Sequence, residues 1–573
     1  MYKLIEKFEK IPVIYLVTFF FVLTLIVYGS SLLNGFVWDD EEQIVNNAAI
    51  QNINSIPYLF TSSTFNTGGA GLSGWYYKPL MPISFSIVHS IFGINSFGFH
   101  LFDVNLHLIN SILVFLVFKT LFKLQKFQFS KSLSFLLASI FLIHPANTES
   151  VAYISSTQEL LYVFFLLITI YFLSKQNKKL SIKKALFLCL TILFSLLSKE
   201  SGVVIIPLVI LFTFLFNKKN TLLITIASIS TFIFYLILRF PIAKTPILQH
   251  SKIIPIANIS FIDRLKTIPF EIFSYLKLFV FPQDLFVAQH WTVTKISDPR
   301  FYLTLPLAIA LFLLIIFILI RLKSKLSIFF TGWIIFSFFL LLNIYPLDMT
   351  LAERWLYGPM IGLLGLIGVI VKKTSQKKLF LFFAFLILLI PIFSVRTIVR
   401  TFDWKSNLTL FSRDEKFSLE SFDLQNNLGV ALFRKGDIYE AKKHFEKSIL
   451  LSPEWWTASN NLGAIYQKEG NINQAKKLYS ISIKNGDYYL AYENLAQLKY
   501  NTEDLDSTIT FLENSLKKLP NNETLNKLAA ISYLQKGATE SAKIYAERAF
   551  FIRNSKENYL LLQTINDNLN NGN

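Results

Sequence analysis

Two adjacent carboxylates, Asp39 and Asp40, follow the first strongly apolar segment, within the polar stretch 34–43. Acidic side chains at the edge of a membrane helix are costly to keep there, which makes them candidates for a catalytic or ion-binding role. A carboxylate pair at this position places negative charge where a reaction or an ion could use it. The alternative is a solvated helix cap outside the bilayer.

Two histidines stand near the beginning of the second long apolar segment, after the sequence Tyr77-Lys78-Pro79 that closes the first long polar loop. His100 and His107 are seven residues apart, so a helix places them on one face. This arrangement suits metal binding or proton handling, and it equally suits two hydrogen-bonded structural histidines.

Three charged clusters lie between or beside later apolar segments. Glu149 follows a His-Pro pair and can cap the next helix. Lys199 and Glu200 separate two apolar segments with almost no loop, where an ion pair is expensive unless it binds a ligand or pairs internally. Glu353 and Arg354 precede a late apolar segment. A guanidinium with aromatic neighbours suits a lipid-linked phosphate there, or belongs to an interfacial aromatic belt.

The elements that must position these residues are membrane helices. The 573 residues are 53% hydrophobic, include 58 Phe and have a mean hydropathy of +0.47, values that exclude a single soluble globule. Apolar runs of about 20 residues recur over residues 1–400, and each can cross a bilayer. We therefore expect a polytopic all-α domain with about eleven crossings. The first run, about 11–33, has no A-x-A-like cleavage site after it, which predicts an uncleaved signal anchor.

The net charge of +18 comes with lysines that lie largely in short loops between the apolar runs. Such a distribution marks cytoplasmic loops and argues against a nucleic-acid partner. It predicts a cytoplasmic N-terminus, with the first loop (34–97), the candidate clusters and the C-terminal tail on the other face. The segment 263–282 is charged as well as apolar, which predicts an amphipathic helix at the membrane interface. The single cysteine, Cys189, lies within an apolar run, so no intrachain disulfide can form.

From about residue 403 onward the chain is polar and repetitive. After a linker at 401–421, a pattern recurs about every 34 residues over 422–560. Asn427-Leu-Gly-Val-Ala returns as Asn461-Leu-Gly-Ala-Ile, and two weaker copies follow. This is the tetratricopeptide helix–turn–helix pattern, and it predicts an α-solenoid of about four repeats. Such an array offers a concave surface to an extended peptide or a partner protein.

Seven short motifs follow one another along the chain, each weak by itself. They are Val37-Trp-Asp-Asp40, Tyr77-Lys-Pro-Leu80, Gly98-Phe-His-Leu101 with His107, His144-Pro with Thr148-Glu-Ser-Val-Ala152, Ser198-Lys-Glu200, Glu353-Arg-Trp-Leu-Tyr357 and Asp403-Trp-Lys405. In this order, and with the repeats behind them, they resemble the TMTC-type family, the transmembrane and tetratricopeptide repeat O-mannosyltransferases, and their bacterial relatives. The resemblance covers nearly the whole chain. This chain departs from the family at Lys78, where Arg is common, and at Thr157-Gln158, where a basic pair is common.

The resemblance implies a GT-C glycosyltransferase that inverts the sugar and takes it from a polyprenyl-phosphate carrier on the non-cytoplasmic side. It implies Asp39 or Asp40 as general base on the acceptor hydroxyl, with a divalent cation on the couplet left open. It implies Lys199, Arg354 and Lys78 as contacts to the donor phosphate, whose charge grows as the glycosidic bond breaks. The supporting residues it implies are Glu149, Glu200, Glu353, His100 and His107.

Two other classes of function stay open. An oligosaccharyltransferase or glycan ligase would move a preassembled glycan, and a non-enzymatic scaffold or transporter would hold a complex through its repeats. A transporter path should place charges through the depth of the bilayer, whereas these charges gather at one face. The first hypothesis takes a protein Ser or Thr hydroxyl as acceptor, recruited by the repeats. Abundant Phe, Ile, Lys and Asn with little Ala points to an AT-rich microbial genome, so a bacterial plasma membrane is the expected location.

Overall fold

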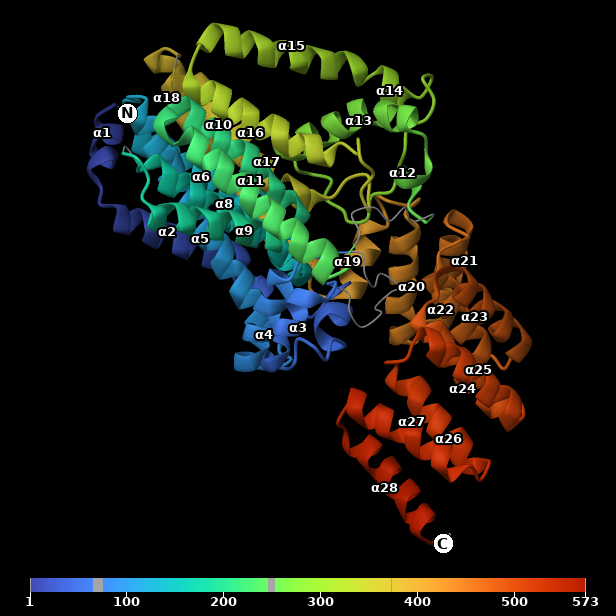
Figure 1. The fold of residues 1–573 in the computed structure, drawn as a ribbon. Coiled ribbons are helices and arrows are strands. Elements are labelled where there is room, and N and C mark those ends of the chain that lie inside the picture. Colours follow the sequence, from blue (N-terminus) through green and yellow to red (C-terminus); the bar gives the residue numbers. More distant parts are fainter. Residues whose placement is uncertain (1, 65–75, 177, 246–252, 373, 572–573) are drawn as a thin grey trace. The chain divides into compact units, whose positions relative to one another are not determined.

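The computed structural model describes residues 2–64, 76–176, 178–245, 253–372 and 374–571 (Figure 1). Helices make up the regular structure in these ranges, where one isolated bridge joins Gln289 to Leu351. The chain divides into two compact units, the first ending at Leu424 and the second beginning at Gln425. The predicted all-α class is therefore confirmed.

The first unit is a bundle of apolar helices. Seven helical segments in the described residues are long and apolar enough to cross a membrane, and four shorter apolar helices accompany them. The number of crossings, about eleven by span length, stays a prediction. The helices of the bundle are α2 (Val13–Tyr28), α4 (Leu80–Phe92), α5 (Ser96–Leu124), α6 (Ser130–Ile143), α8 (Thr157–Ser174), α9 (Ile182–Ser198), α10 (Ile205–Phe216), α11 (Thr221–Ile237), α15 (Leu305–Leu322), α16 (Lys325–Leu341), α17 (Tyr357–Lys372) and α18 (Gln376–Asp403).

Burial separates the inner helices of this bundle from its lipid-facing ones. α5 packs along α2, α6 and α8, and α8 packs along α9. Every residue of α6 from Lys131 to Ile143 is buried, so other helices surround it. The segment that contains α15 has a hydropathy of 3.1 and is only 6% buried, and α15 packs against α13 (Phe261–Val280), α14 (Pro299–Tyr302) and α16. A helix so apolar and so exposed is suited to face lipid.

Short turns connect the bundle helices at the places where the predicted charged residues stand. α7 (Thr148–Ala152) carries Glu149, the turn Glu200–Val204 follows Lys199, and the turn Glu353–Leu356 carries Arg354. The α7 segment packs against the turn Glu353–Leu356, although about 200 residues separate them in sequence. Residues far apart in the chain are thus gathered at these turns.

The segment 401–421, assigned to a linker from the sequence, is an ordered part of the first unit. It contains the end of α18 and the helix α19 (Asn407–Asp414). The backbone N–H of Gly35 donates to the Lys405 carbonyl at 3.1 Å, and the N–H of Trp38 donates to Asn407 Oδ1 at 2.7 Å. This segment therefore holds the beginning of the first loop in place.

α13 is absent from the helical segments that qualify as spans among the described residues. Its predicted position at the membrane interface stays a prediction. The remaining helices of this unit are α1 (Tyr2–Lys10), α3 (Ile56–Thr61) and α12 (Pro255–Asn258).

The second unit is a row of paired helices, as the repeat pattern predicts. Gly436, Gly470 and Gly537 lie in turns within three of the pairs at φ of +95°, +78° and +81°, a left-handed conformation that favours glycine. A side chain at Gly429 would meet the ring of Phe445, and the same relation recurs one repeat later. The helices are α20 (Phe422–Lys435), α21 (Ile438–Leu451), α22 (Trp456–Lys468), α23 (Ile472–Gly486), α24 (Tyr489–Thr502), α25 (Leu505–Lys518), α26 (Glu523–Gln535), α27 (Thr539–Ile552) and α28 (Lys556–Asn571).

Glycines on α17 allow close packing against α16, and this packing can be tested. A Cβ at Gly365 would overlap the ring of Phe330, so Gly365→Val should destabilise the first unit by about 1–3 kcal/mol. Gly29→Ala is the control, because no atom lies within 4 Å of a Cβ there and its φ of −58° suits alanine. Thermal unfolding in detergent measures both. Equal unfolding temperatures for Gly365→Val and the native chain would contradict the packing of α16 on α17.

Candidate active site

The two adjacent aspartates have different environments. Asp40 is fully buried, and its Oδ1 accepts hydrogen bonds from the Ser155 backbone N–H (2.8 Å) and hydroxyl (2.6 Å). Its Oδ2 accepts a hydrogen bond from the Val37 N–H at 3.0 Å. Asp39 is partly exposed, and its Oδ2 accepts a hydrogen bond from the Tyr153 hydroxyl at 2.8 Å. Asp40 therefore fixes the first loop to the turn before α8, while Asp39 presents a carboxylate to the surface.

Burial raises the pKa of both carboxyl groups. For Asp39, the hydrogen bond from Tyr153 and the charge of Arg354 lower the pKa and oppose part of the effect of burial. For Asp40, burial raises the pKa to about 7, although hydrogen bonds from Ser155 and Val37 lower it. A raised pKa suits a group that must accept a proton near neutral pH. No described residue donates a hydrogen bond to Asp39 Oδ1, so that oxygen can take a proton.

Arg354 lies beside the aromatic rings that flank Asp39. Trp38 stacks on Tyr153 with 5.3 Å between ring centres, and the Arg354 guanidinium carbon lies 5.8 Å and 5.9 Å from these two centres. The guanidinium Nη1 forms a buried ion pair with Glu149 Oε1, and the Arg354 backbone N–H donates to Glu149 Oε2 at 2.8 Å. The positive charge is therefore held in one position near Asp39.

Trp355 brings Lys199 to the same region. The Lys199 Nζ and the Arg354 guanidinium carbon each lie 5.9 Å from the centre of the Trp355 ring. Lys199 forms a buried ion pair with Glu159. A pocket of about 10 Å³, roughly the room that one water molecule needs, lies beside this pair and is also lined by Ser201. Two predicted phosphate contacts thus flank one tryptophan, each balanced by a carboxylate.

Lys78 and Glu200 extend this charged region. Burial lowers the pKa of Lys78, the charge of Glu200 raises it and the charge of Lys199 lowers it, so the three groups act on one another. The Lys78 Nζ lies 4.0 Å from the ring centre of Tyr76. Glu200 Oε1 lies 3.4 Å from Nη1 of Arg239. The structure therefore gathers all three predicted phosphate contacts, Lys78, Lys199 and Arg354, within one charged network.

His107 has a structural role in this arrangement. Its Nε2 lies 2.8 Å from the Leu142 carbonyl, which can only accept, so Nε2 carries the proton. Nδ1 then accepts from the Tyr357 hydroxyl at 2.8 Å, and Asn110 donates to that hydroxyl at 3.2 Å. His100 is fully buried as well, and no group of three His, Cys, Asp or Glu in the described part of the chain could hold a metal ion. Of the two interpretations of this pair, the contacts of His107 favour the structural one.

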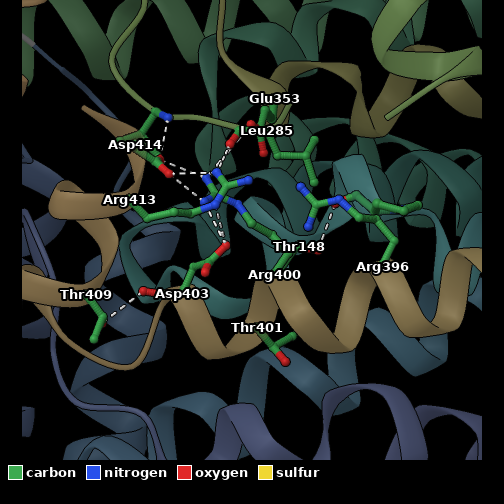
Figure 2. Close-up of polar contacts among 12 residues, drawn as sticks. Thr148, Leu285, Glu353, Arg396, Arg400, Thr401, Asp403, Thr409, Arg413 and Asp414 are labelled. Atoms are coloured by element: carbon green, nitrogen blue, oxygen red, sulfur yellow. Dashed lines mark hydrogen bonds and ion pairs between the residues drawn. The ribbon is translucent and has the colours of Figure 1, made fainter. Parts of the chain in front are cut away.

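Glu353 belongs to a separate cluster of charges around Arg400 (Figure 2). The guanidinium of Arg400 donates to both oxygens of Asp414, at 2.7 Å and 2.9 Å, and its Nη2 lies 3.9 Å from Glu353 Oε1. Arg413 Nε lies 3.0 Å from Asp403 Oδ2. This cluster fastens α19 to the end of α18, and Arg400 balances the charge of Glu353 beside Arg354.

Sequence reasoning missed several residues of this region. Tyr153 and Ser155 hold the two aspartates, and Arg239 approaches Glu200. Asp348 accepts a hydrogen bond from Tyr76 at 3.1 Å, and its charge raises the pKa of Asp39. Each is an isolated polar residue with no spacing that links it to the others. One general rule could have indicated that such residues exist: a charged residue at the end of a membrane helix needs a partner.

Comparisons with known proteins confirm the resemblance to the TMTC-type family. A protein of Caenorhabditis elegans named Protein O-mannosyl-transferase F38B6.6 is 27% identical over 454 residues, which cover 76% of this chain and 62% of that protein. The human Protein O-mannosyl-transferase TMTC3 is 24% identical over 486 residues, which cover 74% of this chain and 50% of the human protein. The chain thus spans about three fifths of the first relative and half of the second.

The repeats have matches of their own. The sequence profile of the tetratricopeptide repeat family matches residues 422–455. Among solved structures, YrrB, described as a TPR protein with an unusual peptide-binding site, is 14% identical and covers 27% of this chain with a TM-score of 0.16. The repeat assignment depends on the family profile and on the helix pairs described above, and not on this likeness.

The buried pair of Arg354 and Glu149 should contribute strongly to folding only as a pair. Either Glu149→Gln or Arg354→Gln leaves one buried charge without its partner and should cost about 3–5 kcal/mol in the free energy of unfolding. The double variant should recover part of that loss. Lys277→Gln is the control, since its pair with Asp284 is exposed and should be worth less than about 1 kcal/mol. Additive losses in the double variant, measured by thermal unfolding, would show that the two side chains do not interact.

The raised pKa of Asp40 predicts how stability changes with pH. Because its folded pKa of about 7 lies above the ordinary value of 3.8, the folded state holds a proton that the unfolded state has released. The stability that this proton contributes is present at low pH and is lost as the pH rises through about 7. The native chain should therefore lose stability relative to Asp40→Asn between about pH 4 and pH 7 in thermal unfolding.

Asp263→Asn is the matched control for this pH experiment. A hydrogen bond from Lys266 lowers the pKa of Asp263, so its contribution has the opposite sign and is lost as the pH falls. A native chain that gains stability relative to Asp40→Asn over the same pH range would refute the raised pKa of Asp40.

Proposed function

We propose that this chain is a membrane glycosyltransferase of the GT-C type, which transfers a sugar from a polyprenyl-phosphate carrier to an acceptor hydroxyl group. The observation that carries the proposal is the partly exposed carboxylate of Asp39, held by Tyr153 beside the fixed charge of Arg354. A base and a cation placed together are what displacement of a sugar from a phosphate requires. The relatives named protein O-mannosyl-transferases support the same class.

In the proposed reaction Asp39 is the general base. The acceptor oxygen forms a bond to the anomeric carbon as the bond from that carbon to the phosphate oxygen breaks. The hydroxyl proton passes to Oδ1 of Asp39, while the Tyr153 hydroxyl holds Oδ2. A single displacement of this kind inverts the anomeric centre. Asp40 has both oxygens engaged by Val37 and Ser155, and acts by positioning the loop that carries Asp39.

The leaving carrier phosphate would be stabilised by the cations around Trp355. Lys199 and Arg354 are each paired with one carboxylate, and both keep further N–H groups with which to bind phosphate oxygens. Lys78 lies near enough to Lys199 and Glu200 for their charges to change its pKa. Because these ion pairs hold the cations in position, the cations need little reorganisation when the charge develops.

The aspartate couplet does not fit a chelated divalent cation in this arrangement. Asp40 is buried and both of its oxygens accept hydrogen bonds from the protein, so Asp39 is the carboxylate of the couplet that is open to a ligand. Metal sites of Mg²⁺ or Mn²⁺ type need several oxygen ligands around one point. The proposed mechanism therefore uses protein groups alone.

The remaining parts of the proposal concern partners and location. The repeats would recruit the acceptor, a protein with Ser or Thr hydroxyls or a glycan, as an extended segment on their concave surface. The enzyme would sit in a plasma membrane with its N-terminus in the cytoplasm, and with the Asp39 region and the repeats outside, as the lysine-rich loops predict.

Sugar transfer by the purified full chain tests the base assignment. A panel of polyprenyl-phosphate sugars would be offered with a membrane-depleted protein extract as acceptor. Asp39→Asn should lower the transfer rate by about 10²–10⁴-fold, the usual contribution of a general base. Asp40→Asn should keep more activity than Asp39→Asn whenever it folds, because it positions the loop and does not take the proton.

Asp284→Asn is the control, since this exposed aspartate pairs only with Lys277 among the described residues. Loss of transfer in Asp40→Asn with full activity in Asp39→Asn would reverse the two roles. If both variants transferred sugar at the native rate, the couplet would be a structural cap and the proposed mechanism would be wrong. Absence of transfer by the native chain from every donor would count against the whole function.

A further inference from the structure

A second pocket lies far from the Asp39 region, where α15 turns into α16 and where α5 and α17 end. Its volume is about 330 Å³, which is within the range of ligand-binding pockets. The residues that line it are Gln125, Leu322, Lys323, Ser324, Lys325, Val369 and Lys372. Three of these seven are lysines and none is acidic. The lining therefore combines positive charge, two neutral polar groups and two apolar side chains, where α5, α15 and α17 end and α16 begins.

The lysines of this pocket are held by different elements. Lys372, at the end of α17, donates to the Gln125 carbonyl at 2.5 Å and lies 4.4 Å from the ring centre of Phe127. Lys325 begins α16, and Lys323 ends α15. Neither Lys323 nor Lys325 lies within ion-pair distance of a carboxylate in the parts of the chain that the structure describes. The pocket thus faces positive charge that its own lining does not neutralise.

The backbone beside the pocket is bent in a way that favours glycine, yet lysine is present. Lys323 has φ 45° and ψ 38°, the left-handed conformation that favours glycine. Lys126, next to the lining residue Gln125, also has a positive φ, 54°.

The position of the pocket indicates what could occupy it. α17 separates it from Arg354, and 16 residues of α-helix span about 24 Å, close to the thickness of the hydrocarbon layer. It lies on the side where the lysine loops gather, which is the expected cytoplasmic side. The apolar surface of α15, most of it exposed, begins at the same turn. A ligand bound in this pocket would have its charged part at the membrane surface and its apolar chains beside α15.

We propose that this pocket binds the phosphate headgroup of an anionic phospholipid from the cytoplasmic leaflet. Lysine ammonium groups at the membrane surface attract such headgroups, and a pocket between helices adds a fixed position for the phosphate oxygens. Leu322 and Val369 contact the glycerol end of the lipid. This site is separate from the proposed sugar transfer and does not depend on it.

Thermal unfolding of the delipidated full chain in detergent tests the proposal. Phosphatidylglycerol should raise the unfolding temperature of the native chain, whereas phosphatidylcholine and inorganic phosphate should not. In the variant Lys323→Gln, Lys325→Gln, Lys372→Gln, the apparent affinity for phosphatidylglycerol should fall about tenfold or more, and native mass spectrometry should show fewer bound lipids. High salt should weaken the native effect.

Lys178→Gln, Lys179→Gln, Lys183→Gln is the matched control, because it removes the same charge from exposed lysines of another loop and of the first turn of α9, on the same side. This control should bind phosphatidylglycerol like the native chain. Equal loss in the two triple variants would mean that only the total charge matters, and would overturn the site. Equal stabilisation by phosphatidylcholine would overturn recognition of charge. Stabilisation by inorganic phosphate alone would identify a site for small anions and would overturn the proposal that a lipid binds there.

Discussion

The buried ion pair of Arg354 and Glu149 is the interaction on which the rest of the candidate site depends. It joins two turns that lie about 200 residues apart in the chain, and it does so through the side chain and the backbone of Arg354 together. Each charge would be costly to bury alone, so the ion pair keeps the two turns together. The rings of Trp38, Tyr153 and Trp355 then lie around the guanidinium. Lys199 and Glu159 form a second buried ion pair. Both cations are therefore held in position, and a carboxylate balances the charge of each.

The segment between the bundle and the repeats contributes more to this region than its place in the chain suggests. Arg400 and Asp414 fix α19 against α18, and Lys405 and Asn407 then accept hydrogen bonds from the first loop. The loop that carries the aspartates is therefore bound on one side by α19 and on the other by Ser155. Attachment on both sides limits how far the loop, and with it Asp39, can move.

Much of the fold was predictable, and less of the site. Apolar runs of membrane length and the repeat with glycine at fixed positions identify helices and helix pairs because both depend on local periodicity. The seven motifs also contain residues that the structure gathers in one charged network, Lys78, Lys199 and Arg354, while their role as phosphate contacts stays a prediction. The partners of these residues were not predictable, since Glu159, Tyr153 and Asp348 meet them through tertiary contacts that leave no pattern in sequence. Nor does sequence separate Asp39 from Asp40, because the difference is the Ser155 hydroxyl 115 residues away.

The residues around Asp39 are far apart in the sequence, and this determines when the site can form during synthesis. Asp39 and Asp40 emerge from the ribosome early, whereas Ser155 comes later and Arg354 later still. Until α17 has been inserted, Glu149 has no cation to neutralise it, and until α19 is made the first loop lacks one of its attachments. The aspartates therefore become a defined site only after nearly the whole membrane unit has been assembled. The candidate site is thus absent from an incomplete chain, because its parts come together only late in synthesis.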